Sequence, residues 1–505
     1  MRKFLPLLAL AACVAGAQSL KDFEKRVTEF TLPNGMHFIV LERHDAPVVS
    51  FHSFVKAGSV DDPAHETGLA HMFEHMAFKG TETIGSKNYP EEKKAMDEVE
   101  RIYEQYDAAR KKPADAQTIA ALGQQLKAAM EKANSYVIPN EYPRIIEENG
   151  GVGMNAGTEE DSTEYFYNFP RNRLELWFLL ESQRFYDPVF REFYKERDVV
   201  REERRMRVES NPQGRLVEAL LKAAFTEHPY REMPGGSAKD IANLRVSYAV
   251  DFFKKYYVPS NIVIGIAGDV DPAECRRFAI KYFGIIPPGP PPTGPAIVEP
   301  PQTAPRQVAV ESDSQPLIAI AYRRPNEHDK DDAVFDVLSE VLAGGRTSLL
   351  YTDLVRDKKI ALGAFAESSF PGSKYPNLFL FFLIPNIGHT SEETEKACFD
   401  IIDRVKNEKV DDETLRRIKT KVRASLIRRL DSDSGMADEL TSYYAAYGDW
   451  RKMFTSIEEI DNVTADDVQR VARKYLVPET RTIAYTVKPA AATSPSSSSP
   501  KGEQQ

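Results

Sequence analysis

The sequence predicts an α+β protein made of two homologous domains, each combining a mixed sheet with helices. Its length of 505 residues exceeds what one ordinary hydrophobic core supports. A proline-rich stretch, 286–305, divides the chain and cannot continue a helix or a central strand, so we expect a semi-rigid linker there. A pattern before this linker recurs after it at a constant offset of 219 residues: Ile241, Asn243, Lys255, Tyr256, Val258 and Pro259 return as Ile460, Asn462, Lys474, Tyr475, Val477 and Pro478.

The amino-acid composition indicates a globular protein and argues against nucleic-acid binding. A hydrophobic fraction of 42% and a charged fraction of 28% are typical of a globular chain. The formal charge of −10 argues against nucleic-acid binding, which requires a basic surface. Three cysteines exclude a disulfide framework, and Cys275 and Cys398 fall in different halves, so we expect two separate thiols.

The two ends of the chain predict segments outside the folded domains. Residues 1–17 combine Arg2 and Lys3 with an apolar run and a small-residue site ending at Ala17, which is typical of a secretory signal peptide. Residues 10–13 also resemble a lipoprotein cleavage site, which would place lipid on Cys13. We favour cleavage after Ala17, and predict export to the periplasm of a Gram-negative bacterium in either case. Residues 488–505 have the composition of a disordered tail.

The first domain, predicted over 18–285, begins with strands. Residues 27–32 and 36–41 alternate around Pro33-Asn34-Gly35, a hairpin signal, and 47–56 reads as a third strand. The strands carry His37, His44 and His52. We interpret these lone histidines as surface or cross-strand residues and not as ligands.

The strands lead into a segment with the spacing of a metal site. On a helix, His71 and His75 project from one face, as two nitrogen ligands of one Zn²⁺ must. Glu74 lies on the same side and could act as a general base. A chance match, or histidines that only fill a polar edge, would be the alternatives. The apolar flanks Leu69 and Phe73 favour the metal interpretation, because histidines suit a buried helix poorly unless something offsets their burial.

Residues 66–81 (ETGLAHMFEHMAFKGT) resemble the active-site helix of the pitrilysin/insulinase metallopeptidases, the family of mitochondrial processing peptidase and many bacterial two-domain subunits. The resemblance implies the pitrilysin-like two-domain fold and a zinc endopeptidase acting on unfolded peptides. It implies one Zn²⁺ per chain, held by His71 and His75, with Glu74 as general base on the zinc-bound water.

A hydrolytic zinc normally has three protein ligands, and the two histidines supply only two of them. We therefore expect an acidic ligand on a later helix. Glu196, Val199, Val200 and Glu203 share one helical face in the run 193–204. By resemblance, Glu203 corresponds to the family's third zinc ligand. Glu196 corresponds to an acidic residue that does not bind the metal itself but orients a residue that does. Chain order does not separate Glu203 from Glu202. The shared face favours Glu203.

Residues 88–149 follow helical spacing in two runs, and we predict a charged helical hairpin inserted into the first domain, with Asp115 capping its second helix. Its role stays open between a lid, a partner-docking element and a neutral insertion. The following segment, with Asn155 and Ala156, resembles the family's substrate-binding edge strand, where a peptide adds to the sheet through backbone hydrogen bonds. An ordinary strand is the alternative.

The second domain, predicted over 306–487, should lack metal, because its helix at 332–343 carries no histidine. The family holds an Arg, and a Tyr seven residues later, that grip the substrate carbonyl. Arg356 matches the Arg, but Gly363 stands at the Tyr position. We therefore expect a related subunit that supplies the pair in a heterodimer, or else a homodimer. A non-catalytic assembly subunit and a periplasmic peptide-binding protein remain the alternative functions.

Overall fold

The computed structural model describes residues 23–111 and 115–489. The predicted signal peptide, Cys13 and all but two residues of the predicted tail lie outside these ranges. The strands are β1 (Val27–Thr31), β2 (His37–Glu42), β3 (Val48–Val55), β4 (Val152–Thr158), β5 (Thr163–Pro170), β6 (Ile262–Gly268), β7 (Arg306–Glu311), β8 (Ile318–Arg324), β9 (Ala361–Phe370), β10 (Asn377–Pro385) and β11 (Arg481–Val487). The α-helices are α2 (Leu69–Met76), α3 (Tyr89–Lys111), α4 (Ala116–Asn134), α5 (Glu141–Glu148), α6 (Leu174–Tyr186), α7 (Phe193–Arg204), α8 (Pro212–Ala224), α9 (Ala238–Ile241), α10 (Val246–Tyr256), α11 (Pro272–Tyr282), α12 (Asp332–Ala343), α13 (Ser391–Asn407), α14 (Asp412–Arg429), α15 (Asp433–Tyr447), α16 (Lys452–Asn462) and α17 (Ala465–Tyr475).

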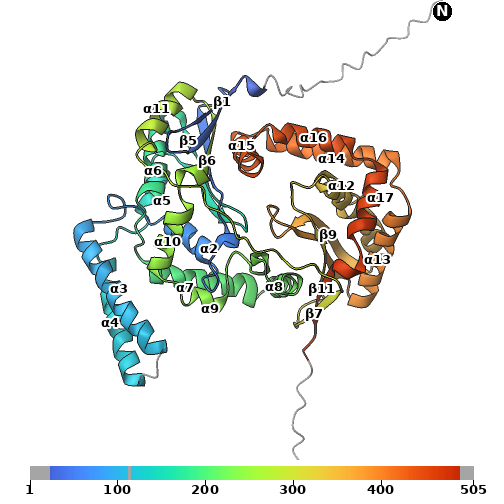
Figure 1. The fold of residues 1–505 in the computed structure, drawn as a ribbon, viewed down its shortest axis with the longest axis horizontal. Coiled ribbons are helices and arrows are strands. Elements are labelled where there is room, and N and C mark those ends of the chain that lie inside the picture. The colour runs from blue at the N-terminus through green and yellow to red at the C-terminus, as the bar shows by residue number, and fades with distance from the viewer. Residues whose placement is uncertain (1–22, 112–114, 490–505) are drawn as a thin grey trace, which may run out of the picture.

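Two sheets, each with its own helices, form the two halves of the molecule (Figure 1). The first sheet has the order β1-β2-β6-β3-β5-β4 and the second the order β7-β11-β8-β10-β9. In the first, β1 and β2 pair antiparallel through the predicted hairpin, while β6 runs parallel to β2. The α+β prediction with two mixed-sheet domains is confirmed.

The first sheet is covered on both faces. Phe51 of β3 stacks on Trp177 of α6 with ring centroids 4.3 Å apart, and this face holds the larger core. Every residue of the central strand β6 is buried, which explains its continuous apolar sequence instead of an alternating one. Apolar residues of the opposite face, Ile39 and Val263 among them, pack against α15.

One helix of each half packs against the sheet of the other half. The first-half helix α8 packs on β7, β8 and β11 of the second sheet, and α15 of the second half packs on β2, β3 and β6 of the first (Figure 1). At Gly265, an added Cβ would lie 2.6 Å from the carbonyl oxygen of Ala437, so β6 and α15 approach at backbone distance. Because each sheet is covered by a helix of the other half, separating the halves would expose both apolar faces.

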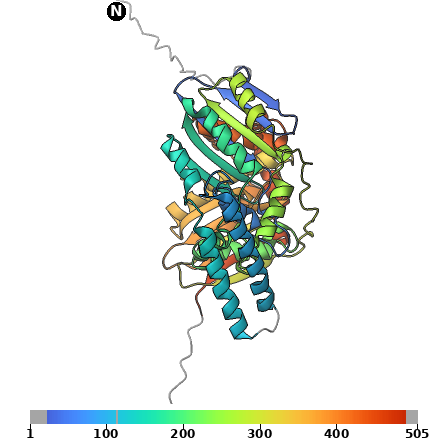
Figure 2. The ribbon, with the colours of Figure 1, turned by 90° about the vertical axis from the view of Figure 1, so that its left-hand side faces the viewer.

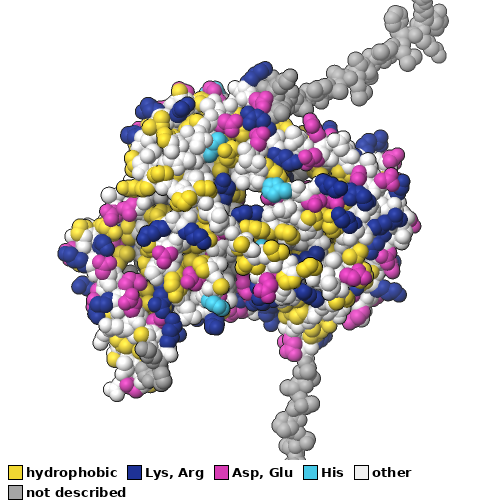
Figure 3. Space-filling view, in the orientation of Figure 1, with side chains coloured by type: hydrophobic (Ala, Val, Ile, Leu, Met, Phe, Trp, Pro, Cys, Tyr) yellow, Lys and Arg dark blue, Asp and Glu magenta, His cyan; other side chains and the backbone are white. Residues whose placement is uncertain are grey.

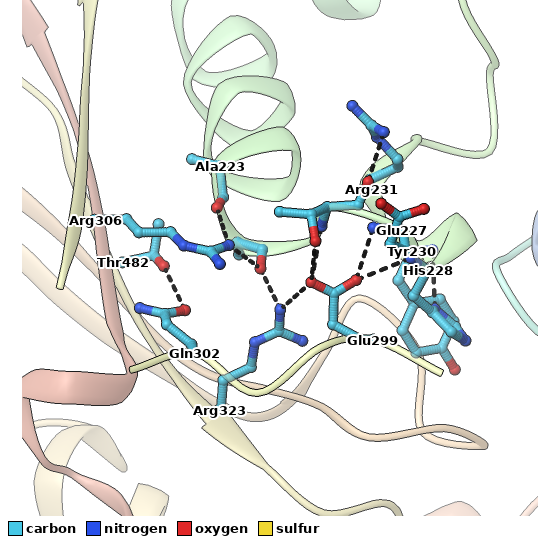
Figure 4. Close-up of polar contacts among 12 residues, drawn as sticks. Ala223, Glu227, His228, Tyr230, Arg231, Glu299, Gln302, Arg306, Arg323 and Thr482 are labelled. Atoms are coloured by element: carbon cyan, nitrogen blue, oxygen red, sulfur yellow. Dashed lines mark hydrogen bonds and ion pairs between the residues drawn. The ribbon is translucent and has the colours of Figure 1, made fainter. Parts of the chain in front are cut away.

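The linker is anchored at Glu299 (Figure 4). Its carboxylate accepts hydrogen bonds from the backbone N–H groups of Thr226, Glu227 and His228, at 2.8–2.9 Å, and pairs with Arg323 of β8 at 2.9 Å. Burial opposes ionisation, but the backbone donors and Arg323 outweigh it and lower the pKa of Glu299 to about 2. This residue therefore ties the linker to both halves.

The predicted hairpin is formed by α3 and α4, which extend away from the body of the molecule (Figure 2). Asp115 caps α4 as predicted, accepting a hydrogen bond of 2.6 Å from the Thr118 N–H. The prediction of a plain hairpin over 88–149 is incomplete, because a third helix, α5, follows within the same stretch and packs near β4. Its eight residues are too short for a reliable periodicity signal. Within the described residues, we find no helix with the length and apolarity that crossing a bilayer requires.

Candidate metal centre

The helix α2 is fixed at its start by Asp62. Its carboxylate accepts from the backbone N–H groups of Gly68 at 2.7 Å and Ala70 at 2.8 Å, which satisfies two of the free donors of the first turn. Gly68 has φ +89°, and Gly235 O would lie 3.2 Å from a Cβ there, so a side chain fits poorly. Burial raises the pKa of Asp62 well above its usual value. The sequence prediction missed Asp62, which follows no capping spacing.

Two imidazoles and one carboxylate converge beside this helix. Nε2 of His71 lies 3.7 Å, and Nε2 of His75 3.4 Å, from Oε2 of Glu203. These three ligand atoms all lie within 4.8 Å of one another, and the two rings are nearly perpendicular at 87°. Glu203 comes from α7, and its other oxygen, Oε1, pairs with Arg207 at 2.8 Å.

The neighbouring carboxylate, Glu202, points elsewhere. It pairs with Arg205 at 2.6 Å, and its side chain is 53% exposed, against 18% for Glu203. The structure therefore places Glu203, and not Glu202, beside the histidines, in agreement with the shared helical face.

These residues fit a zinc ion. Burial, followed by the nearby His75, lowers the pKa of His71 to about 4, so its ring is neutral as a ligand must be. Nδ1 of His71 is buried and has no hydrogen-bond partner in the described residues. Two imidazole nitrogens and one carboxylate oxygen form the donor set of many catalytic zinc sites, which leave the fourth position open.

Glu74 stands apart from the three converging atoms. Its Oε2 accepts a hydrogen bond of 2.7 Å from the hydroxyl of Thr158 at the end of β4. Burial is the main cause that raises its pKa, with the Thr158 bond acting in the opposite direction. A carboxylate that is oriented by a neighbour and has a raised pKa suits a general base. The sequence prediction did not identify Thr158 as this partner.

Glu196 contacts His75 at Nδ1, the ring nitrogen that does not face Glu203. Its Oε2 lies 3.5 Å from Nδ1 of His75, and its Oε1 pairs with Lys79, which also contacts Glu192 at 3.2 Å. Burial opposes ionisation of Glu196, but the bonds from His75 and Lys79 outweigh it and lower the pKa to about 2. The predicted place of Glu196 as an acidic neighbour agrees with this geometry; Lys79 was not predicted.

A cavity of about 340 Å³ opens beside Glu74 and His75. The chain between α4 and α5, including Val137, Ile138 and Asn140, forms one of its walls. The end of the predicted insertion thus lies against the candidate centre, while α3 and α4 extend away from it.

The predicted substrate residues lie in different places. Asn155 and Ala156 are in β4, which pairs with β5 on one side and forms an edge of the sheet. Arg356 lies in a π-helical turn (Tyr351–Asp357), where it is exposed, pairs with Asp357 at 2.7 Å and does not line the cavity beside Glu74. Gly363 lies on β9, the edge strand of the second sheet.

The fold and this cluster define a two-domain protein with an inverted zinc-peptidase motif in its first half. A sequence model of the insulinase peptidases (peptidase family M16) matches residues 38–137 and 127–233, and a model of the peptidase M16 inactive domain matches residues 247–422. The chain belongs to the M16, or pitrilysin/insulinase, family of peptidases.

Relatives extend over nearly the whole chain. The zinc protease PqqE of Helicobacter pylori is 26% identical over 489 residues, covering 94% of this chain and 96% of its own. The probable mitochondrial-processing peptidase subunit beta of Arabidopsis thaliana is 23% identical over 471 residues, covering 90% of this chain and 76% of its own.

Solved structures share the fold. The crystal structure of a protease from Helicobacter pylori superposes with a TM-score of 0.76 at 24% identity, over 91% of this chain and 99% of that one. The periplasmic protease PqqL of Escherichia coli gives a TM-score of 0.68 at 16% identity, over 92% of this chain and 48% of that one.

Proposed function

We propose that this protein is an exported zinc-dependent endopeptidase. The observation that carries the proposal is the convergence of two imidazole nitrogens and the Glu203 carboxylate, with Glu74 held separately by Thr158. Relatives named as zinc proteases support the same chemistry, and a solved relative named as periplasmic agrees with the predicted export.

The residues would divide the chemistry as follows. His71, His75 and Glu203 would hold the metal, which would supply Lewis-acid activation of a water molecule and of the scissile carbonyl. Glu74 takes a proton from the attacking water and passes it to the leaving amine. Thr158 orients Glu74, while Glu196 and Lys79 fix the ring of His75.

The substrate would be an unfolded peptide that adds to β4. This strand ends at Thr158, the partner of Glu74, so a peptide paired along its free edge at Asn155 and Ala156 would pass the base directly. Backbone pairing gives affinity without strict side-chain selection, which agrees with unfolded segments as a class.

The test is Glu74→Gln in the full-length chain. The variant should keep the metal content of the parent and lose hydrolysis of an unfolded reporter peptide by about 10²- to 10⁴-fold, because it loses the base and no ligand. Glu148→Gln, on the exposed side of α5, is the matched control and should cleave at the parental rate. Parental cleavage by Glu74→Gln would contradict the mechanism. Retained zinc with no cleavage by the parent, alone or with a related chain, would favour a peptide-binding protein or an assembly subunit.

We also propose a related partner subunit. Arg356 keeps the family's Arg and pairs with Asp357 at the surface, but Gly363 offers no hydroxyl, so the chain lacks the Tyr that completes the pair for the substrate carbonyl. Loss of one such donor typically costs about 10²- to 10³-fold in rate. A related subunit in a heterodimer would supply the pair; a homodimer using another donor is the alternative. Adding a related subunit without the His-x-x-Glu-His motif should raise the rate by a comparable factor, and full activity of the isolated chain, unchanged by any partner, would contradict the proposal.

A further inference from the structure

A second group of ligand-type side chains lies on the opposite face of the first sheet. His52 of β3 and Glu164 of β5 point away from the core face that holds Phe51 and Tyr165, because neighbours in a strand alternate. Asp438 of α15, in the second half, completes the group. His52 is only 4% exposed, so it is not a surface histidine. It makes the predicted kind of cross-strand contact, to Glu164 on the neighbouring β5.

The hydrogen bonds of the Thr441 hydroxyl favour the tautomer of His52 with its hydrogen on Nδ1. The hydroxyl of Thr441 donates to helix carbonyl oxygens, 3.0 Å from that of Ala437 and 2.9 Å from that of Asp438. Its oxygen is then the acceptor for Nδ1 of His52, at 2.7 Å, so Nδ1 carries the hydrogen. In the neutral ring the lone pair is therefore on Nε2.

This lone pair faces two carboxylates. Nε2 of His52 lies 3.2 Å from Oε2 of Glu164 and 3.8 Å from Oδ1 of Asp438. In the first centre the corresponding distances are 3.4 and 3.7 Å, and in both groups all three ligand atoms lie within 4.8 Å of one another. Three acceptors at such separations need either a cation between them or a proton on Nε2 of His52, and metal analysis distinguishes the two.

Neighbouring hydroxyls orient the carboxylates, as they do around metal ligands. The hydroxyl of Ser162 donates to the other oxygen of Glu164 at 3.2 Å, and that of Ser442 donates to Asp438 at 3.0 Å. A cavity of about 440 Å³ between the halves reaches Glu164 and Ser442, which gives an ion a path.

The walls of this cavity are mainly acidic, and they keep an excess of negative charge although burial raises the pKa of Glu160 to about 8. Its acidic side chains outnumber its two lysines, Lys56 and Lys374, and are Glu159, Glu160, Asp161, Glu164 and Glu327. Carboxylates crowded in a recess raise the local concentration of cations.

We propose that His52, Glu164 and Asp438 form a second divalent-cation site, distinct from the catalytic one, which joins α15 of the second half to the first sheet. One imidazole nitrogen and two carboxylate oxygens suit Zn²⁺ or Mn²⁺ better than a soft metal. An ion there would stabilise the packing of the two halves, because it binds the assembled arrangement and not the separated elements.

The experiment uses the full-length chain with His71→Ala and Glu203→Ala, so that the first centre is disabled. After equilibration with Zn²⁺ and gel filtration, metal analysis should find about one equivalent, and Zn²⁺ should raise the Tm. Adding His52→Gln should abolish both effects. Co²⁺ in place of Zn²⁺ should give a visible spectrum that depends on His52.

The matched control is His44→Gln. His44 also lies between a Glu and an Asp, but its Nε2 contacts Glu42 at 2.7 Å and its Nδ1 contacts Asp269 at 2.6 Å, on opposite sides of the ring, so no single ion reaches both. This change should leave the metal count unaltered.

No bound metal and an unchanged Tm in the disabled protein would overturn the proposal, and so would metal that persists after His52→Gln. If the disabled protein does not fold, the same measurement is made on the parent chain. Two equivalents of bound metal per chain, falling to one in His52→Gln and in Asp438→Asn, would support the site. One equivalent in the parent would overturn it. These readouts do not involve peptide cleavage, so they stand or fall independently of the proposed activity.

Discussion

The hydroxyl of Ser368 on β9 donates a hydrogen bond of 2.6 Å to Oδ1 of Asp336 on α12. The same relationship occurs in the first half, where Thr158 on the edge strand β4 donates to Glu74 on α2. In this relationship Asp336 corresponds to Glu74, and the helix α12 carries no histidine beside it. The second half thus repeats the hydrogen bond from an edge-strand hydroxyl to a helix carboxylate, without the imidazoles of the first.

Asp336→Asn should stabilise the protein at neutral pH. Burial is the main cause that raises the pKa of Asp336 to about 6, above the value near 3.9 of an unfolded chain. Well below pH 4 the Asp336 carboxyl is protonated in both the folded and the unfolded protein, so it does not lower the free energy of unfolding. As the pH rises from about 4 to about 6, the unfolded chain releases this proton while the folded protein still holds it, so the wild type loses stability that Asn, which keeps an acceptor for Ser368, does not lose.

The expected gain in the free energy of unfolding is about 1–2 kcal/mol at pH 7.5, allowing for partial exposure, and less than about 0.5 kcal/mol at pH 4. Thermal unfolding of both proteins at the two pH values measures it. Asp400→Asn, on the exposed side of α13, should shift the Tm equally at both. A Tm difference for Asp336→Asn that does not change with pH would contradict the argument.

Glu203→Ala should remove the zinc of the first centre, whereas Glu202→Ala should retain it. The two residues are neighbours, but only Glu203 places an oxygen within 3.7 Å of both histidine Nε2 atoms. Removing one of three protein ligands leaves too few to hold the ion. Zinc content is measured after dialysis. Both variants carry His52→Gln as well, so that only zinc in the first centre is measured. Equal zinc retention by the two variants would overturn the assignment of Glu203.

Glu196→Gln should weaken zinc binding about 10- to 100-fold while leaving the fold intact, because the carboxylate orients His75 and balances Lys79. Competition with a chromogenic chelator gives the affinity. Asp198→Asn, an exposed change on the same helix, is the control and should have parental affinity. An affinity for Glu196→Gln within twofold of the parent would show that the His75 contact contributes nothing.

Gly265→Ala should destabilise the protein by about 1–3 kcal/mol, because the new Cβ would lie 2.6 Å from the carbonyl oxygen of Ala437, which is backbone and cannot move aside, and 2.7 Å from Cγ2 of Thr441. Gly235→Ala, where a Cβ meets nothing within 4 Å, should be close to neutral. Urea unfolding of the three proteins compares them. If both variants unfolded with the parent, β6 and α15 would not be in close contact in solution.

Much of the local structure follows from short-range patterns. The Pro33-Asn34-Gly35 hairpin, the cap at Asp115 and the bounds of the helix at 332–343 are confirmed, because turn chemistry, capping and helical periodicity act over a few residues. The separate thiols of Cys275 and Cys398 are also confirmed, and both are buried.

By itself, the sequence determined the family, the two-sheet architecture and the motif that brings His71, Glu74 and His75 together, since all three lie within two turns of one helix. Only the tertiary structure decided that Thr158 orients Glu74, that α8 and α15 are exchanged, and that His52, Glu164 and Asp438 meet. These contacts join segments tens to hundreds of residues apart. They depend on strand register and on which face each helix covers, and no local pattern encodes either.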